Sequence, residues 1–120
     1  DYDIYLISSS MIKKKKSLKF DLRKDNFKTL KNWIYPDIII HCAAETNIDK
    51  CECEKTNCKK INFDSVRKLI KLFPKSKFIF ISSDSVYSGS KRHSENKLKK
   101  PLNYYGYLKL GRLMPYVLKG

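Results

Sequence analysis

Short runs of β-branched and aromatic residues, separated by stretches with helical periodicity, set the strongest limit on how this chain can fold. Residues 37–41 contain the clearest run, and residues 78–81 form another. Each is too short for a free-standing helix and apolar at consecutive positions, as in a strand that is covered on both faces. Between them, apolar side chains recur every three or four positions from residue 63 to 73, which predicts an amphipathic helix that Pro74 ends.

The rest of the chain fits the same alternation. Residues 4–7 and 18–20 predict two further strands, and Asn26 can cap a helix that Pro36 ends. A last helix begins near Asn103, and Pro115 should kink or end it. Apolar strands separated by helices imply parallel β-α-β units. We therefore expect an α/β fold with a partial doubly wound parallel sheet over residues 1–120, and no second domain.

Composition sets the outer limits. With 120 residues and 42% hydrophobic content, the chain can bury one modest core. No apolar run approaches the roughly 20 residues of a membrane span, and no secretory signal is recognisable, so we expect a soluble cytoplasmic protein without membrane contact. The net charge of +14 would suit nucleic-acid binding, but only four of the 26 basic residues are arginine and the lysines are scattered. This pattern favours a solvated basic surface over a nucleic-acid partner.

Four cysteines lie close together in the sequence, at positions 42, 51, 53 and 58. They form no C-x-x-C pair, and no histidine pair accompanies them at zinc-ligand spacing, so we expect no metal site. Neither His41, at the end of an apolar run, nor His93, in a polar loop, resembles a metal ligand. We expect the cysteines to be reduced thiols.

The ends of two predicted strands carry small and hydroxyl-bearing residues. Residues 41–46 (HCAAET) follow one strand, and residues 82–87 (SSDSVY) follow the next. In open parallel sheets, ligands bind beyond the carboxyl ends of the strands. Ala43 and Ala44 would let a flat ligand approach the backbone, and the serines place hydroxyl groups at the same edge.

A Tyr-x-x-x-Lys pair, Tyr105 and Lys109, begins the last predicted helix. The i, i+4 spacing puts both side chains on one helical face, where a lysine ammonium can lower the pKa of the phenol from its reference value of about 10. Such a tyrosine can exchange a proton with a carbinol oxygen, and Ser83 can hydrogen-bond to the same oxygen. In a chain with eight tyrosines the pair alone is a weak signal, but its position after a strand-end serine strengthens it.

At this point the sequence resembles the dTDP-4-dehydrorhamnose reductases, which are extended short-chain dehydrogenases/reductases that modify sugar nucleotides. The order and spacing of the motifs carry the resemblance more than any single motif does. The matching segments are residues 21–23 (DLR), 36–52 (PDIIIHCAAETNIDKCE), 61–62 (IN), 81–89 (ISSDSVYSG) and 101–111 (PLNYYGYLKLG). The resemblance implies a Rossmann-like domain that binds NADP or NAD and a nucleotide-sugar substrate, and it leaves open a homodimer of the full-length relative.

The resemblance also implies roles for individual residues. Tyr105 would donate the proton as hydride reduces a C4 ketone, Lys109 would hold the nicotinamide ribose and tune Tyr105, and Ser83 would polarise the carbonyl. Asn62 matches a family asparagine whose role could be structural or catalytic. The implied cofactor-binding residues are Asp21, Leu22, Ala43, Ala44, Thr46, Ser82, Tyr105 and Lys109, and the implied substrate-binding residues are Asp84, Ser85 and Val86.

The sequence departs from the family pattern in three places. It contains no Gly-x-x-Gly-x-x-Gly, because its four glycines are at positions 89, 106, 111 and 120. We therefore expect the first strand and the glycine-rich turn that seats the pyrophosphate to be missing, with residues 1–8 matching the second strand. The chain should also stop before the substrate-binding lobe. Ser85 stands where an aromatic residue that touches substrate is common, and Arg112 where an acidic residue is usual.

The expected function is NAD(P)H-dependent reduction of a 4-keto sugar nucleotide in dTDP-rhamnose and cell-surface polysaccharide biosynthesis, impaired in so short a chain. Two alternatives remain open. One is an epimerase or dehydratase of the same superfamily, which would use the same tyrosine and lysine. The other is a non-catalytic relative that binds a nucleotide or a partner.

Overall fold

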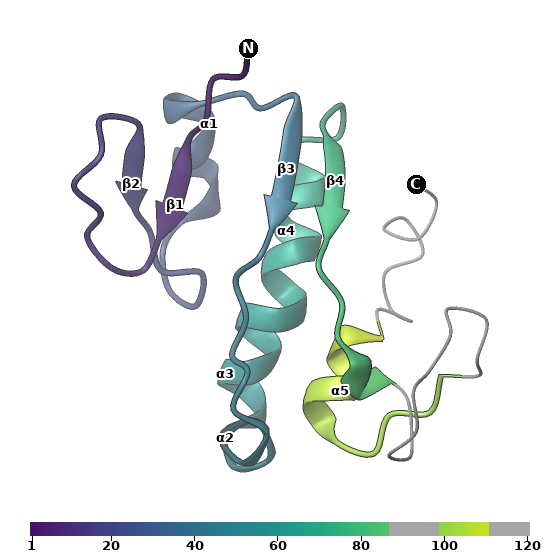
Figure 1. The fold of residues 1–120 in the computed structure, drawn as a ribbon. Helices are drawn as coiled ribbons and strands as arrows, with labels where there is room; N and C mark the ends of the chain where they lie inside the picture. Colours follow the sequence, from purple (N-terminus) through teal and green to yellow (C-terminus); the bar gives the residue numbers. More distant parts are fainter. Residues whose placement is uncertain (87–98, 111–120) are drawn as a thin grey trace.

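The computed structural model describes residues 1–86 and 99–110, which form short parallel strands packed against helices (Figure 1). The strands are β1 (Leu6–Ser8), β2 (Ser17–Lys19), β3 (Ile38–His41) and β4 (Lys77–Phe80). The α-helices are α1 (Leu30–Trp33), α2 (Ile48–Cys53), α3 (Lys55–Lys59), α4 (Ser65–Leu72) and α5 (Tyr104–Lys109). Two 3-10 turns, η1 (Phe27–Thr29) and η3 (Asp84–Val86), and a π-helical segment, η2 (Lys60–Asp64), complete the order.

The four strands form two parallel pairs, β1 with β2 and β3 with β4. Ile39 of β3 is opposite Phe78 of β4, and the connection between these strands carries α2, α3 and α4. Figure 1 shows α4 lying along one face of the β3–β4 pair. The parallel β-α-β unit confirms the predicted α/β fold. Within the described residues, the two pairs remain separate sheets, because no hydrogen bonds join β1 to β3.

The helical crossover, which is the connection from β3 to β4, begins earlier in the sequence than the periodicity of its apolar residues predicts. Helix α2 starts after Asn47, whose side chain accepts a hydrogen bond from the Lys50 backbone N–H at 2.9 Å. Glu54, with φ −114° and ψ 55°, then breaks the helix between α2 and α3. The break shifts the phase of the buried positions, so the pattern is regular only from Phe63 onward.

Two clusters of buried side chains form the core. One joins the crossover to α5 and contains Cys51, Cys58, Phe63, Val66, Tyr105 and Leu108. The other joins β2 and the first helical segment to α4 and contains Phe20, Phe27, Leu30, Leu69 and Phe73. Phe78 of β4 packs against both clusters, so the β3–β4 pair connects them.

Only one face of the β3–β4 pair is covered. The exposed fractions are 44% for Ile38, 60% for Ile40, 37% for Ile79 and 47% for Ile81. The prediction that these strands are covered on both faces is therefore wrong for this structure, because no element among residues 1–86 and 99–110 packs on that side. None of the helices described is long and apolar enough to cross a membrane.

The ends of the first and last helical segments follow the sequence signals. Asn26 caps η1 by accepting from the Lys28 backbone N–H, and α1 ends at Trp33, before Pro36. Asn103 caps α5 by accepting from the Gly106 N–H at 2.7 Å, as predicted. The kink expected at Pro115 lies outside the described residues.

Candidate active site

The segment that follows β3 is fixed by the side chain of Asn62. Its amide oxygen accepts from the Glu45 backbone N–H at 3.1 Å, and its amide nitrogen donates to the Glu45 carbonyl at 3.1 Å. Asn62 is completely buried, so these bonds replace lost hydration. The family asparagine therefore has a structural role here, holding the backbone between Ala44 and Thr46 while Thr46 and Ala43 remain exposed.

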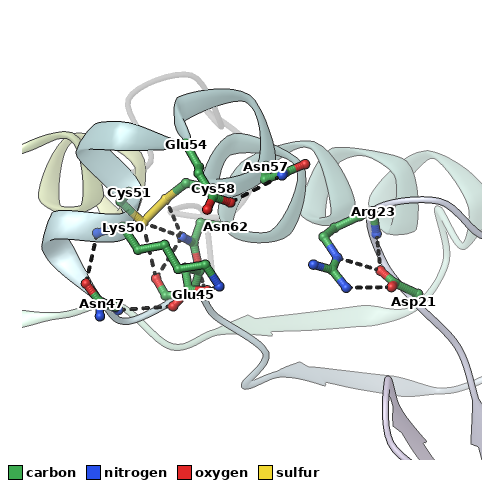
Figure 2. Close-up of polar contacts among 10 residues, drawn as sticks. All are labelled: Asp21, Arg23, Glu45, Asn47, Lys50, Cys51, Glu54, Asn57, Cys58 and Asn62. Carbon is green, nitrogen blue, oxygen red and sulfur yellow. Dashed lines mark hydrogen bonds and ion pairs between the residues drawn. A yellow bond between two sulfur atoms is a disulfide. The ribbon is translucent and has the colours of Figure 1, made fainter.

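Residues 45–50 add a charged border to this segment. The Glu45 carboxylate accepts from the Lys50 ammonium at 2.7 Å and from the Asn47 backbone N–H at 3.2 Å, and both contacts lower the pKa of Glu45. Figure 2 shows this group beside Asn62 and the sulfur atoms of Cys51 and Cys58.

Two of the implied cofactor-binding residues, Asp21 and Leu22, precede Arg23, which lines a polar depression together with Glu45 and Lys50 of this border. Arg23 donates to the two carboxylate oxygens of Asp21 at 3.0 and 2.8 Å, which holds the pKa of Asp21 well below its usual range (Figure 2). Leu22 packs against the second core cluster. The depression is lined by Arg23, Glu45, Lys50, Glu54, Asn57, Cys58 and Ile61. The fold thus brings residues 21–23 near the segment that follows β3.

Helix α5 places Tyr105 and Lys109 beyond the carboxyl end of β4 (Figure 1). Both residues are buried, with exposed fractions of 8% and 3%. The Lys109 ammonium donates to the Ile81 carbonyl at 3.0 Å and lies 6.0 Å from the centre of the Tyr105 ring. Ser82 donates from its hydroxyl to the Lys109 carbonyl at 3.2 Å. Burial lowers the pKa of Lys109.

Gly106 allows α5 to approach the turn that follows β4. A Cβ atom at this position would lie 2.1 Å from the Ser85 carbonyl oxygen and 3.1 Å from Cβ of Pro101. Any larger residue would therefore push α5 away from η3. In that turn, Ser83 accepts from the Ser85 N–H at 3.2 Å, and Val86 is buried. The side chain of Asp84 lies outside the described part of the structure.

His41 is a residue of this region for which the sequence predicted no role. It ends β3, is 4% exposed, and its Nε2 lies 2.9 Å from the Ser65 hydroxyl. Ser65 donates its own proton to the Ile61 carbonyl at 2.6 Å, so His41 Nε2 must carry the proton that they share. Among the described residues, Nδ1 then has no hydrogen-bond partner. Burial, and secondly the charge of Lys109, lower the pKa of His41 to about 4.

The cysteines differ from the expectation of four reduced thiols. Cys51 and Cys58 form a disulfide, while Cys42 and Cys53 are free and exposed. In an unbroken helix, residues seven apart lie about 10 Å apart along the axis, too far for a disulfide. The break at Glu54 brings the two Cα atoms within 5.2 Å. In the part of the chain that the structure describes, no group of three His, Cys, Asp or Glu residues could hold a metal ion.

Comparison with known proteins gives three consistent results. Residues 10–112 match the model of the RmlD substrate binding domain. A hypothetical dTDP-4-dehydrorhamnose reductase from Sulfolobus tokodaii is 38% identical, with a TM-score of 0.72 over 87% of this chain and 40% of that chain. The dTDP-4-dehydrorhamnose reductase of Bacillus anthracis, solved in complex with NADP, is 32% identical, with a TM-score of 0.60 over 69% of this chain and 31% of that chain.

Among curated proteins, methionine adenosyltransferase 2 subunit beta of Danio rerio is 37% identical over 76 residues. The match spans 62% of this chain but only 24% of that protein. The chain thus corresponds to a part of each of these relatives. Since the family model covers most of its length, and the structure supplies the expected parallel β-α-β unit, the chain belongs to the RmlD substrate binding domain family.

Proposed function

We propose that this chain forms part of an NAD(P)H-dependent reductase that acts on the 4-keto group of a sugar nucleotide, in dTDP-rhamnose synthesis. The observation that carries the proposal is the position of Tyr105 and Lys109. They share one face of α5, and Lys109 is anchored to the end of β4 through Ile81 and Ser82. The carboxyl end of a parallel strand is where such folds bind ligands.

The residues around this position fit a nicotinamide dinucleotide. The ammonium of Lys109 uses one donor on the Ile81 carbonyl and has further donors for the hydroxyls of a ribose. Ala43 and Thr46 are exposed on a backbone that Asn62 keeps rigid, so a flat group can lie against it. We assign Asp21 and Leu22 to the adenine side, and Ala44 and Ser82 to the remaining cofactor contacts.

The cofactor, when bound, supplies hydride to the substrate carbonyl carbon. In the proposed mechanism, Tyr105 donates its phenolic proton to the carbonyl oxygen as negative charge develops there. Lys109 stabilises the resulting phenolate, because an ammonium favours the charged form of a nearby acid. The Ser83 hydroxyl hydrogen-bonds to the same oxygen and orients it. Ser85, Val86 and Asp84 would face the sugar.

An assay of 4-keto sugar nucleotide reduction, monitored through the oxidation of NADPH or NADH, tests the proposal. The assay uses the chain extended by the first strand and glycine-rich turn of a related reductase, because the sequence contains no such turn. Tyr105→Phe should lower kcat by about 10²-fold or more, the usual effect of losing a general acid. Tyr107→Phe is the matched control, since Tyr107 is 45% exposed on the same helix and should retain full activity. Equal activity of the two variants would contradict the assignment.

A second candidate is a non-catalytic subunit that binds another protein. The curated relatives support it, because they are named as the beta subunit of methionine adenosyltransferase 2. Sedimentation of the extended chain with a methionine adenosyltransferase catalytic subunit would test it. A stable complex, together with cofactor binding but no turnover of 4-keto sugar nucleotides, would favour the subunit function over the reductase.

A further inference from the structure

The Cys51–Cys58 disulfide lies next to Glu45, in the segment that follows β3. It connects α2 to α3 across the helix break at Glu54. Both cysteines are buried, with exposed fractions of 0% and 2%. The residues between them, 52–57, are all exposed, so local opening of this short loop would bring the sulfurs to solvent.

Asn62 links the disulfide to the Glu45 backbone. Its amide nitrogen lies 3.1 Å from Sγ of Cys58 and 3.1 Å from the Glu45 carbonyl oxygen. The orientation of the amide is fixed, because the Glu45 N–H requires an oxygen and the Glu45 carbonyl requires an N–H. The sulfur therefore receives a hydrogen bond from the same group that holds the candidate cofactor segment (Figure 2).

Reduction would change the hydrogen bonds at Glu45. Sγ of Cys51 lies 3.5 Å from the Glu45 carbonyl oxygen. In the disulfide this sulfur carries no proton, so the contact is not a hydrogen bond. As a thiol, Cys51 becomes a second donor to the Glu45 carbonyl, which already accepts from Asn62. The new thiol proton of Cys58 competes for space with the Asn62 amide, which donates to the same sulfur in the disulfide. Loss of the cross-link also frees α2 and α3 to move relative to each other.

The same pair supports the helix that carries the candidate catalytic residues. Cys51 and Cys58 pack in one cluster with Tyr105 and Leu108 of α5. In addition, Glu52, beside Cys51, accepts a hydrogen bond from the Tyr104 backbone N–H at 2.6 Å. Movement of α2 would therefore reach both the segment after β3 and α5.

We propose that Cys51 and Cys58 form a reversible dithiol–disulfide site that sets how firmly residues 43–46 are held. A dithiol reductant transfers two electrons to the Cys51–Cys58 bond. That bond breaks, the two cysteines take up the two protons of the reductant, and the reductant becomes a disulfide. The oxidised form holds the segment firmly and the reduced form loosens it. The oxidised form should bind the cofactor more tightly than the reduced form, a consequence that rests on the proposed function.

The test uses the full 120-residue chain in buffers of reduced and oxidised dithiothreitol. Alkylation and mass spectrometry should count two free thiols in the oxidised form and four in the reduced form. Amide hydrogen exchange at Glu45, followed by NMR, should be about tenfold faster after reduction, the effect of weakening one hydrogen-bonded contact. Cys53→Ser should keep this response, and Cys58→Ser should abolish it.

Two results would overturn the inference: four reactive thiols without reductant, or the same exchange rate at Glu45 in both forms. Because the wild-type chain supplies these readouts, they do not depend on the folding of a variant. Cofactor binding is measured separately on the extended chain. A redox response at Glu45 without cofactor binding in either form would support the reversible site and contradict the proposed function.

Discussion

The two faces of the β3–β4 pair differ in how far the described chain covers them. On the helical side, Phe78 and Phe80 pack against the buried crossover. The ring centre of His41 lies 6.1 Å from that of Phe78 and 6.0 Å from that of Phe80. On the other side, Ile38, Ile40, Ile79 and Ile81 are exposed. Both faces belong to the same two strands, so their difference in exposure arises from the other elements that pack on each face.

This contrast shows which side positions the candidate site. Asn62, the disulfide and α5 all lie on the helical side, and they hold the segment after β3 and Lys109 in place. Of the isoleucines on the other face, Ile81 takes part through its backbone carbonyl, which accepts from Lys109. An apolar face of this kind is typical of a sheet that another layer covers, and the chain spans only 40% of the Sulfolobus tokodaii reductase.

The largest difference between the faces should appear when core side chains are truncated. Phe63→Ala removes a ring that is 2% exposed, and should lower the free energy of unfolding by about 3–5 kcal/mol. Ile40→Ala removes atoms from a side chain that is 60% exposed, and should cost less than about 1 kcal/mol. Urea unfolding measures both. Similar costs would mean that the isoleucine face is buried in solution.

A smaller effect should follow from loss of the Asn62 amide. Asn62→Ala leaves the Glu45 N–H and carbonyl without their partner, and should destabilise the chain by about 2–3 kcal/mol. The control is Asn57→Ala, because Asn57 is exposed and its side-chain amide lies 3.4 Å from the Glu54 carboxylate. It should change stability by less than about 0.5 kcal/mol. If the two variants unfold alike, Asn62 does not hold the segment.

The smallest of these effects concerns pH. Because the pKa of His41 is lowered to about 4, the imidazole stays neutral in the folded chain while the unfolded chain takes up a proton below pH 6.5. Stability present above pH 6.5 should therefore be lost as pH falls toward 4, by about 2 kcal/mol between pH 7 and pH 5.

Unfolding of wild type and His41→Gln across this interval measures the effect. The variant should show a flatter dependence on pH, since it lacks the imidazole that takes up a proton on unfolding. An unchanged slope would show that His41 is accessible to protons in the folded chain.

Local signals in the sequence predict much of the fold. The apolar runs locate β3 and β4, and Asn103 marks the start of α5, because these features depend on neighbouring residues alone. Tyr105 and Lys109 share a helical face for the same reason. Their roles, and those of Ser83 and the cofactor residues, stay predictions.

Features that depend on distant contacts could not be predicted in this way. The disulfide requires the break at Glu54, which places Cys51 near Cys58, and no local pattern signals it. His41 is buried beside Ser65, Phe78 and Phe80, which are remote in sequence. The exposure of the isoleucine face depends on what packs beside the strands, whereas their composition favours burial on both sides.

Titration calorimetry with NADPH and NADH tests the central claim, that Lys109 and the segment after β3 form a nicotinamide dinucleotide site. It compares the 120-residue chain, the chain extended by the first strand and glycine-rich turn, and the extended chain with Lys109→Met. We predict that the extended chain binds, that the 120-residue chain does not, and that Lys109→Met weakens binding by about tenfold or more, the loss of one charge-assisted hydrogen bond. Absence of binding to a folded extended chain would contradict the claim.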